Sequence, residues 1–524
     1  MVKTKAEELA ELQREISVSE FFEKNRHLLG FDNPLRALST TVRELTDNSL
    51  DAIEEMNVLP DIKIEIKQLA ETRFVVSVID NGPGIVKEQI PRVFAKLLYG
   101  SKFGRNIQSR GVQGIGVSAS VLYGQLTTGK AAKIISKIGK NKLAHYYELK
   151  IDINRNEPQI IKDQVVDFVQ EHGTKVEIEL EGKYQKGRQG VEEYLKQVAI
   201  ANPHAEITYI SPLNEKMLFK RNVNKLPKEP KAIKPHPYGI EIGILIRMLN
   251  NSKAKTLRGF FAKEFSRVSV GLAKEICQKA NVKFDIKPSL VVHEEAERLI
   301  RAIRETKISS PPLDCLSPIG ETAIIAGLKK EVKGDFYTAV LRRPSVYRGN
   351  PFLVELGLVF GGELPSGELI RVIRLANKVP LQYQQSACAI TKSIISTSWR
   401  NYGLSQSKGA LPEGPVLLMV HIASVWVPFT SEAKEAIAHY PEIIKQIKLA
   451  LQEIGRKLGS YIRKTVKAQE HQERVNLFEK YIPELAGSLS SLTGEKKENI
   501  ESNLNKIFKK GLKEILPDGE KEQS

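Results

Sequence analysis

Three polar side chains in the segment RELTDNSLDA, residues 43–52, have a spacing that suits metal-dependent hydrolysis. Glu44 and Asn48 are four residues apart and Asp51 follows three later, so an α-helix would present all three on one face. The Glu44 carboxylate can orient or deprotonate a water molecule, and the Asn48 carbonyl oxygen can hold a hard cation. This pair could hydrolyse a metal-bound phosphate. The same spacing also fits an amphipathic helix whose polar face is only solvated.

A glycine-rich turn, DNGPG at residues 80–84, follows the apolar run TRFVVSVI. A strand that ends in such a turn can direct the Asp80 carboxylate into a cavity while the backbone turns sharply. Asp80 could then accept a hydrogen bond from the exocyclic amine of adenine. Because Gly82 and Gly84 lack side chains, a base could lie against their backbone. The alternative is an ordinary Asx-type turn at a strand end.

A second glycine cluster, GVQGIGVS at residues 111–118, leads into a segment with helix character. Backbone N–H groups of such a loop, together with the N-terminus of the helix that follows, bind phosphate. The cluster matches neither GxxxxGK[ST] nor a GxGxxG that follows a strand. Ser101 and Lys102 offer a hydroxyl and an ammonium to the same phosphates, unless Lys102 is a solvated loop lysine. Thr174, in the segment His172-Gly173-Thr174, could hold a water on the adenine side.

The N-terminal part of the chain must supply the elements that position these residues. Hydrophobic periodicity predicts a mixed sheet with helices over it, an α+β layer. The expected helices span residues 6–29 and 33–56, and the expected strands span 61–68, 72–79, 133–138, 144–153 and 174–180.

The rest of the chain divides by composition. A proline- and lysine-rich stretch at residues 211–238 predicts an exposed, basic connection between domains. Residues 241–305 have a helical pattern, broken at Lys287-Pro288. A second α+β stretch begins near Pro311 and ends in a long helix, expected at about 434–480, with a weakly packed tail after Leu485. Its expected strands are 335–342, 352–361, 368–377 and 415–425.

Length and composition describe a multidomain protein with a polyanionic partner. A chain of 524 residues suggests about three domains. The net charge of +17 favours nucleic acid, although a Lys- and Glu-rich proteome adapted to heat would explain part of it. Three scattered cysteines indicate neither a zinc site nor a disulfide framework. Without a leader-like segment or a run of 18 apolar residues, we expect a cytoplasmic protein with no membrane partner.

Taken in order, the motifs resemble those of the GHKL ATPases, a superfamily that includes gyrase, heat-shock chaperones, histidine kinases and mismatch-repair proteins. The resemblance covers residues 30–180: a helix with Glu and Asn, a strand ending in DNGPG, a glycine-rich lid, and HGT before a strand. It implies an ATP-binding sandwich of the GHKL (Bergerat) type.

Over its whole length the chain resembles the ATP-binding B subunits of the archaeal type IIB DNA topoisomerases. The segments that carry this resemblance are residues 33–52, 96–120, 257–276, 313–321 and 425–438. It implies a GHKL ATP-binding domain with an N-terminal strap at 1–230, a helix-two-turns-helix domain at 231–308, a transducer at 309–480 and a C-terminal tail at 481–524. Thr46-Asp47 departs from the family, which often has an apolar residue and Glu there.

The resemblance also implies roles for individual residues. Glu44 would be the catalytic base, and Lys434, matching the lysine of the family's transducer loop, would reach the γ-phosphate. Asn48 would hold Mg²⁺. The implied ATP-binding residues are Asn48, Asp80, Gly84, Ser101, Lys102, Gly111, Val112, Gln113, Gly114, Ile115, Gly116, Val117, Ser118, Thr174 and Lys434.

The implied activity is an ATP-operated clamp. ATP would dimerise two B subunits around duplex DNA, and a separate A subunit would cut the strands within an A2B2 heterotetramer. Toprim-type cleavage needs an Asp-x-Asp pair, and this sequence contains none, so cleavage must come from elsewhere. The alternative is a chaperone or signalling ATPase that uses the same pocket on protein clients.

Overall fold

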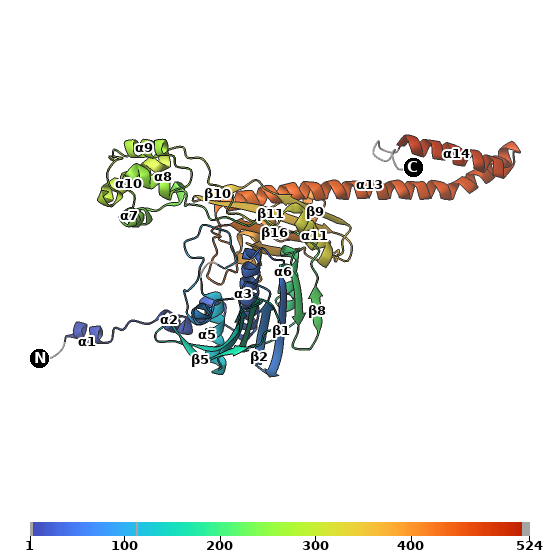
Figure 1. Cartoon of the computed structure of the whole chain (residues 1–524). Helices are drawn as coiled ribbons and strands as arrows, with labels where there is room; N and C mark the ends of the chain where they lie inside the picture. The colour runs from blue at the N-terminus through green and yellow to red at the C-terminus, as the bar shows by residue number, and fades with distance from the viewer. Residues whose placement is uncertain (1–3, 112–113, 516–524) are drawn as a thin grey trace. The chain divides into compact units, whose positions relative to one another are not determined.

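The computed structural model describes residues 4–111 and 114–515 (Figure 1). These residues form two compact units. The first contains the residues up to Arg400 together with Leu404–Gly455, and the second contains Asn401–Gly403 and the residues from Arg456 onward. No helix in the described part of the chain is long and apolar enough to cross a membrane.

The N-terminal segment is less continuous than its sequence pattern suggests. In place of one helix over 6–29 there are α1 Lys5–Glu11, α2 Val18–Lys24 and a 3₁₀ helix, η1 Arg26–Leu29. The Ser17 side chain accepts a hydrogen bond from the Glu20 backbone N–H and so starts a new helix at this point. Gly30, at φ +82°, ends η1 in the left-handed conformation that glycine favours.

The first unit contains an eight-stranded sheet with the order β5-β4-β3-β6-β2-β1-β7-β8. Neighbouring strands run antiparallel except β1 and β7, which are parallel. The strands are β1 Asp61–Ala70, β2 Arg73–Asp80, β3 Ala132–Lys137, β4 Ala144–Asp152, β5 Glu157–Val166, β6 Gly173–Glu181, β7 Glu206–Ile210 and β8 Lys216–Phe219.

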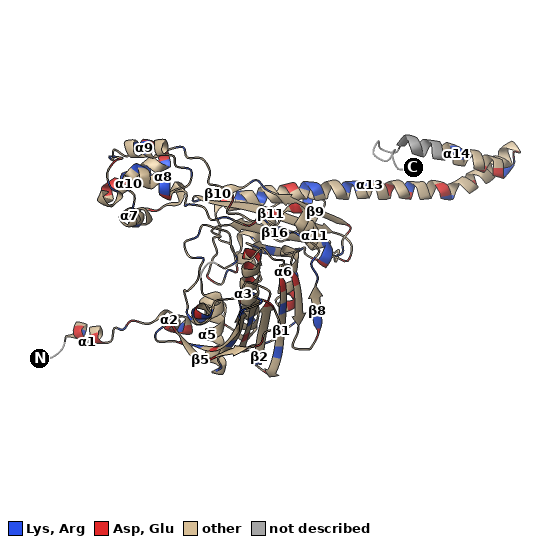
Figure 2. Cartoon of the chain, in the orientation of Figure 1, with Lys and Arg blue, Asp and Glu red and all other residues tan. Residues whose placement is uncertain are grey.

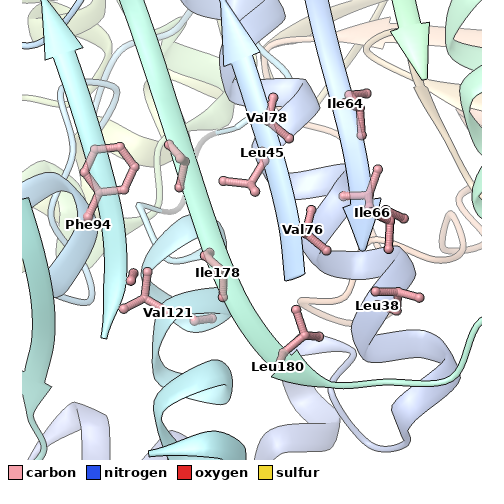
Figure 3. Close-up of a cluster of buried hydrophobic side chains, with 14 of the residues drawn as sticks. Leu38, Leu45, Ile64, Ile66, Val76, Val78, Phe94, Val121, Ile178 and Leu180 are labelled. Carbon is pink, nitrogen blue, oxygen red and sulfur yellow. The ribbon is translucent and has the colours of Figure 1, made fainter. Parts of the chain in front are cut away.

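Helices cover one face of this sheet and enclose the core (Figure 1). The helices of this part are α3 Pro34–Glu55, α4 Ile90–Ala95, α5 Gly116–Thr128 and α6 Val191–Ala201, with the short η2 Lys87–Gln89 before α4. Leu38 and Leu45 of α3 belong to the same buried cluster as Val76 and Val78 of β2 (Figure 3). The predicted α+β sandwich is therefore confirmed, and α3 occupies the predicted helix position almost to the residue.

Three strands of this sheet were not predicted: β5, β7 and β8. Most side chains of β5 are exposed, so its sequence lacks the alternation that marks a half-buried strand. β8 has only four residues and lies within the proline- and lysine-rich stretch. β5 and β8 are the edge strands of this sheet, so each pairs with a single neighbour.

The predicted helical region folds around a core of its own. Phe260, Phe261 and Phe265 meet at its centre, with ring centroids 5.3–5.7 Å apart. Its elements are η3 Pro237–Gly239, α7 Ile242–Asn251, α8 Leu257–Glu264, α9 Val270–Lys279, η4 Pro288–Leu290 and α10 His293–Glu305.

The second α+β region contains a sheet with the order β10-β11-β16-β12-β13, and β9 pairs with β11. The central strand β16 runs antiparallel to β11 and parallel to β12, and all nine of its residues are buried. The elements are α11 Glu321–Glu331, β9 Phe336–Leu341, β10 Ser345–Tyr347, β11 Asn350–Phe360, β12 Arg371–Ala376, β13 Val379–Pro380, η5 Gln385–Ala387, α12 Ala389–Ile395, η6 Trp399–Tyr402 and β16 Val416–Ser424. A two-stranded sheet pairs β14 Ser405–Gln406 with β15 Pro412–Glu413.

The expected long C-terminal helix is present, with different ends. Helix α13 spans Pro441–Thr493 and α14 spans Lys497–Ile515. Lys434 was expected at the start of the long helix, but it lies in an irregular loop before Pro441. The expected end near Lys480 falls inside α13, so at least this part of the expected tail is helical.

Candidate functional site

Helix α3 positions the first group of predicted residues. The Asn33 side chain caps it, accepting from the Arg36 backbone N–H at 3.0 Å, and Pro34 occupies the first turn. Leu45 and Ile53 are buried in the core, which leaves the opposite face of the helix for polar residues.

Thirteen of the predicted ATP-binding residues, together with Glu44, line a single cavity of about 390 Å³. Val112 and Gln113 lie outside the described residues. The lining includes Glu44, Asn48, Asp80, Gly84, Ser101, Lys102, Gly111, Gly114, Ile115, Gly116, Val117, Ser118, Thr174 and Lys434. Residues from α3, β2, the glycine-rich loop, β6 and the loop before α13 thus meet in one place.

The Glu44 carboxylate lies between two cations. Arg43 Nη2 donates to Glu44 Oε1 at 3.0 Å. Burial alone would raise the pKa of Glu44, but Arg43 and Lys434 outweigh burial and hold that pKa below its usual value. Gly116 makes room for the carboxylate, because a Cβ at that position would stand 1.8 Å from Glu44 Oε2. Glu44 is therefore an ionised, fixed carboxylate at neutral pH, as a base or water-orienting group must be.

Asn48 presents its amide oxygen to the glycine-rich loop. Its Nδ2 donates to the Glu44 carbonyl oxygen at 2.7 Å, which fixes the orientation of the amide. A Cβ on Gly111 would stand 3.5 Å from Asn48 Oδ1. Among the described residues no group of three His, Cys, Asp or Glu side chains could hold a metal ion. One amide oxygen beside a glycine-rich loop fits Mg²⁺, which usually takes few protein ligands and completes its shell with water and substrate phosphates.

Asp80 is fixed by three hydrogen bonds at the end of β2. Its Oδ1 accepts from the backbone N–H groups of Gly82 at 2.9 Å and Thr174 at 3.1 Å, and its Oδ2 accepts from Ser49 Oγ at 2.9 Å. Burial raises the pKa of Asp80, and these hydrogen bonds offset part of that rise. Gly84, at φ +69°, approaches β3 so closely that a Cβ would stand 2.2 Å from the Lys137 carbonyl oxygen. The turn needs glycine there, and it aims a rigid carboxylate into the cavity.

Asp51 and Lys102 form an ion pair with each other, which their sequence positions did not predict. Asp51 does not reach into the cavity with Glu44 and Asn48. It binds the Lys102 ammonium, and its Oδ1 accepts from Arg110 Nη1 at 2.8 Å. Lys102 lines the cavity, yet in this structure its charge is paired with Asp51 and held at the wall.

Lys434 comes from the second α+β region and reaches the cavity of the first. Its Nζ donates to the carbonyl oxygen of Arg110 at 3.2 Å. Lys434 has φ +54°, a conformation that costs a side-chain-bearing residue energy and persists where its surroundings enforce it.

Sequence reasoning missed a buried ionic cluster behind the cavity, where acidic residues gather on α3 (Figure 2). Arg110 Nη2 donates to Glu54 Oε1 at 2.7 Å and to Asn202 Oδ1 at 2.6 Å. Lys378, from the second α+β region, lies 3.9 Å from Glu54 Oε2. Burial would lower the pKa of Arg110, but Glu54 and Asp51 raise it. The pairing is between distant segments, so no local spacing signals it.

The same region links the lid to the second α+β region by hydrogen bonds. Gln108 exchanges two hydrogen bonds with the Ser317 backbone, at 2.7 and 3.2 Å. Asn377 Nδ2 donates to the Ser109 carbonyl oxygen at 3.0 Å. The segment that leads into the glycine-rich loop is therefore hydrogen-bonded to the second α+β region as well.

Asp47 was noted in the sequence only as a departure from the family pattern. It is buried beside the cavity, and Tyr194 donates a hydrogen bond to its Oδ1 at 3.1 Å. Burial, with the nearby Glu44 charge, raises the pKa of Asp47 to about 7. A second carboxyl group with a different proton affinity thus lies one helical turn from Glu44.

Comparison with known proteins agrees with this geometry. The family model of histidine kinase-, DNA gyrase B-, and HSP90-like ATPases matches residues 34–183, which implies ATP binding. The model of the topoisomerase VI B subunit transducer matches residues 311–474.

Individual relatives match across both regions. The B subunit of type 2 DNA topoisomerase 6 from Methanococcoides burtonii is 49% identical over 486 residues, which cover 93% of this chain and 78% of that protein. The corresponding protein of Methanosarcina barkeri is 48% identical over 490 residues, covering 93% and 79%. That of Pyrococcus furiosus is 38% identical over 533 residues, covering 92% of each. The chain therefore belongs to the family of type 2 DNA topoisomerase 6 B subunits, the ATP-hydrolysing subunits of DNA topoisomerase VI.

Proposed function

We propose that this protein is an ATP-operated clamp. ATP joins two copies of the chain around duplex DNA, and a separate A subunit cuts and reseals the strands in an A2B2 assembly, so that one duplex passes through another and supercoils relax. We further propose the four domains 1–230, 231–308, 309–480 and 481–524, of which the last boundary falls inside α13. The observation that carries the proposal is the entry of Lys434 into the ATP cavity from a separate region.

Hydrolysis depends on residues that are already oriented. Glu44, ionised between Arg43 and Lys434, aligns the attacking water and accepts its proton. Asp80 accepts from the exocyclic amine of adenine, and the glycine-rich loop donates backbone N–H groups to the phosphates. Asn48 would hold Mg²⁺ through Oδ1. When bound, this ion neutralises charge on the phosphate oxygens.

Lys434 couples ATP hydrolysis to the arrangement of the two α+β regions. A charge-assisted contact between its ammonium and the γ-phosphate contributes roughly 1.5–3 kcal/mol. That contact forms only when the loop before α13 stands at the cavity, so the nucleotide favours one arrangement of the two regions. Release of phosphate removes the contact.

The experiment is an ATPase assay with and without supercoiled duplex, for this protein alone and with its A subunit. We expect turnover to respond to DNA in the complex, and supercoils to relax only when both subunits and ATP are present. A rate that is indifferent to DNA in both settings would indicate a chaperone-like ATPase and contradict the clamp.

A further inference from the structure

Two arginines on α3 hold the loop that carries Lys434. Arg36 and Arg43 are seven residues apart, two turns along one face of the helix. Arg36 pairs with the Glu435 side chain, and Arg43 Nη1 donates to the Ala433 carbonyl oxygen at 3.3 Å. The residues on both sides of Lys434 are thus attached to the helix that carries the catalytic base.

The Arg36–Glu435 pair joins segments 399 residues apart. The side chain of Glu435 is 3% exposed and that of Arg36 is 19% exposed. A buried carboxylate is costly unless a cation and hydrogen bonds compensate it, so Glu435 is stable in this place only with Arg36 beside it. Arg36 is itself oriented by Asp32, at 2.7 Å, and by the Tyr383 ring, whose centroid lies 4.9 Å from the guanidinium carbon.

The backbone of the loop is also held from the second sheet. Arg374, on β12, donates to the carbonyl oxygens of Leu381 at 2.6 Å and Tyr383 at 2.9 Å, with a longer contact of 3.5 Å to that of Glu435. The left-handed conformation of Lys434 is unfavourable for a residue with a side chain and persists only where its surroundings enforce it. The loop is therefore fixed from both sides of the boundary between the two regions.

We propose that Arg36 and Glu435 are positioning residues that set the Lys434 ammonium at the ATP cavity. The inference rests on the role proposed above for Lys434. The described residues that line the cavity include Lys434 and exclude Arg36 and Glu435, so the pair acts through the loop and not on the nucleotide. Loss of the pair frees Lys434 to leave the site, and hydrolysis slows while nucleotide binding through Asp80 and the glycine loop persists.

The test measures kcat and the Kd of a non-hydrolysable ATP analogue for the full chain. For Glu435→Gln and for Arg36→Gln we expect kcat to fall roughly tenfold and the Kd to change less than about threefold, as for an interaction made mainly in the transition state. Arg36→Lys, which keeps the charge, should recover part of the rate. Glu363→Gln removes a carboxylate from the exposed Lys333–Glu363 pair and is the matched control, with both constants unchanged.

Combination with Lys434→Ala separates the inference from the proposal on which it depends. If the pair acts through Lys434, adding Glu435→Gln to Lys434→Ala causes no further loss of rate. A further loss, or a wild-type rate for Glu435→Gln while Lys434→Ala is slow, would overturn the inference and leave the role of Lys434 intact. A wild-type rate for Lys434→Ala itself would overturn that role first. Arg36 is more exposed than Glu435, so Arg36→Gln keeps the test valid if Glu435→Gln does not fold.

Discussion

The Lys434 ammonium donates to the carbonyl oxygen of Arg110 at 3.2 Å, across 324 residues of sequence. The side chain of the same Arg110 binds Asp51 and Glu54 on α3. One residue beside the glycine-rich loop therefore contacts both α3, which carries Glu44, and the loop that carries Lys434. A displacement of Arg110 would therefore change contacts with both segments.

Replacement of Lys434 by alanine should slow hydrolysis without preventing binding. The side chain offers one charge-assisted contact, so its loss should lower kcat by roughly ten- to hundred-fold. Steady-state ATPase rates and analogue binding by calorimetry measure the two effects separately. Lys445→Ala, at an exposed position of α13, is the control. Equal losses in binding and in kcat would show that Lys434 stabilises bound ATP as much as it stabilises the transition state of hydrolysis.

Gly116→Ala should displace the Glu44 carboxylate, the proposed base. The added methyl group would stand 1.8 Å from Glu44 Oε2, and because a carboxylate is the flexible end of its side chain, Glu44 is the group that moves. We expect a loss of turnover of roughly tenfold or more with the fold retained, since a misplaced base loses proton-transfer efficiency. Gly243→Ala, in α7, meets nothing within 4 Å and serves as the control. Normal turnover by Gly116→Ala would mean that Glu44 works from another position.

The sequence alone sufficed to predict which short, contiguous motifs would meet in the candidate site. Residues 43–52, 80–84 and 111–118 carry their own periodicity and turn chemistry. The structure brings Glu44 and all the described residues predicted to bind ATP to one cavity, but not Asp51. Local rules work here because helix phase and glycine turns decide where each side chain points.

The remainder depends on pairings between distant segments. No local pattern could reveal that Lys102 would bind Asp51, or that Arg110 would be buried between Asp51 and Glu54. The start of α13 was misjudged because Lys434 and its neighbours read as helical, whereas Arg36 and Arg43 hold them in an irregular loop. Such tertiary contacts override the intrinsic helix propensity of a segment, and a local sequence pattern does not reveal them.

Asp47→Asn should change the pH dependence of stability. The folded-state pKa of Asp47 is about 7, above its usual value of 3.8, so the folded protein binds more protons than the unfolded chain between these values. The free energy of unfolding contributed by this group therefore falls as pH rises through that range. Asparagine keeps an acceptor for Tyr194 and carries no charge.

Thermal unfolding at about pH 5 and about pH 8 measures this effect. The variant should gain stability relative to wild type at the higher pH, on the order of a few kcal/mol. Asp152→Asn, at the end of β4 and away from the cavity, controls for a general effect of charge. A difference in melting temperature between variant and wild type that is the same at both pH values would contradict a buried, titrating carboxyl.

Asp80→Asn should weaken the selection of adenine. The Asp80 carboxylate accepts hydrogen bonds from Gly82, Thr174 and Ser49. Asparagine has only one acceptor oxygen, and its NH2 group can donate but cannot accept a hydrogen bond from the amine of adenine. Loss of a hydrogen bond with charged character corresponds to roughly a ten- to hundred-fold rise in Kd for ATP. Competition by GTP, measured against a fluorescent ATP analogue, should improve relative to wild type. Unchanged preference for ATP would remove Asp80 from the recognition of the base.

The basic connection between the first sheet and the helical region should contact DNA. Lys231, Lys234 and Arg267 line a groove of about 700 Å³. Arg267 is fixed there, because its Nε donates to the Ser310 carbonyl oxygen at 3.1 Å. Lys274 of α9 is a further cation of the helical region, and its ammonium lies over the Phe284 ring, 5.1 Å from the centroid.

Salt dependence tests this interaction. Each phosphate neutralised by a lysine releases counterions, so DNA affinity should fall steeply with salt. Lys231→Gln with Lys234→Gln should weaken binding for all sequences and reduce the slope of log K against log salt by about two, one for each ammonium group removed. Lys408→Gln, at an exposed position of the second α+β region, should leave the slope unchanged. An affinity that does not depend on salt would contradict DNA binding in this groove, because contacts between lysine and phosphate release counterions.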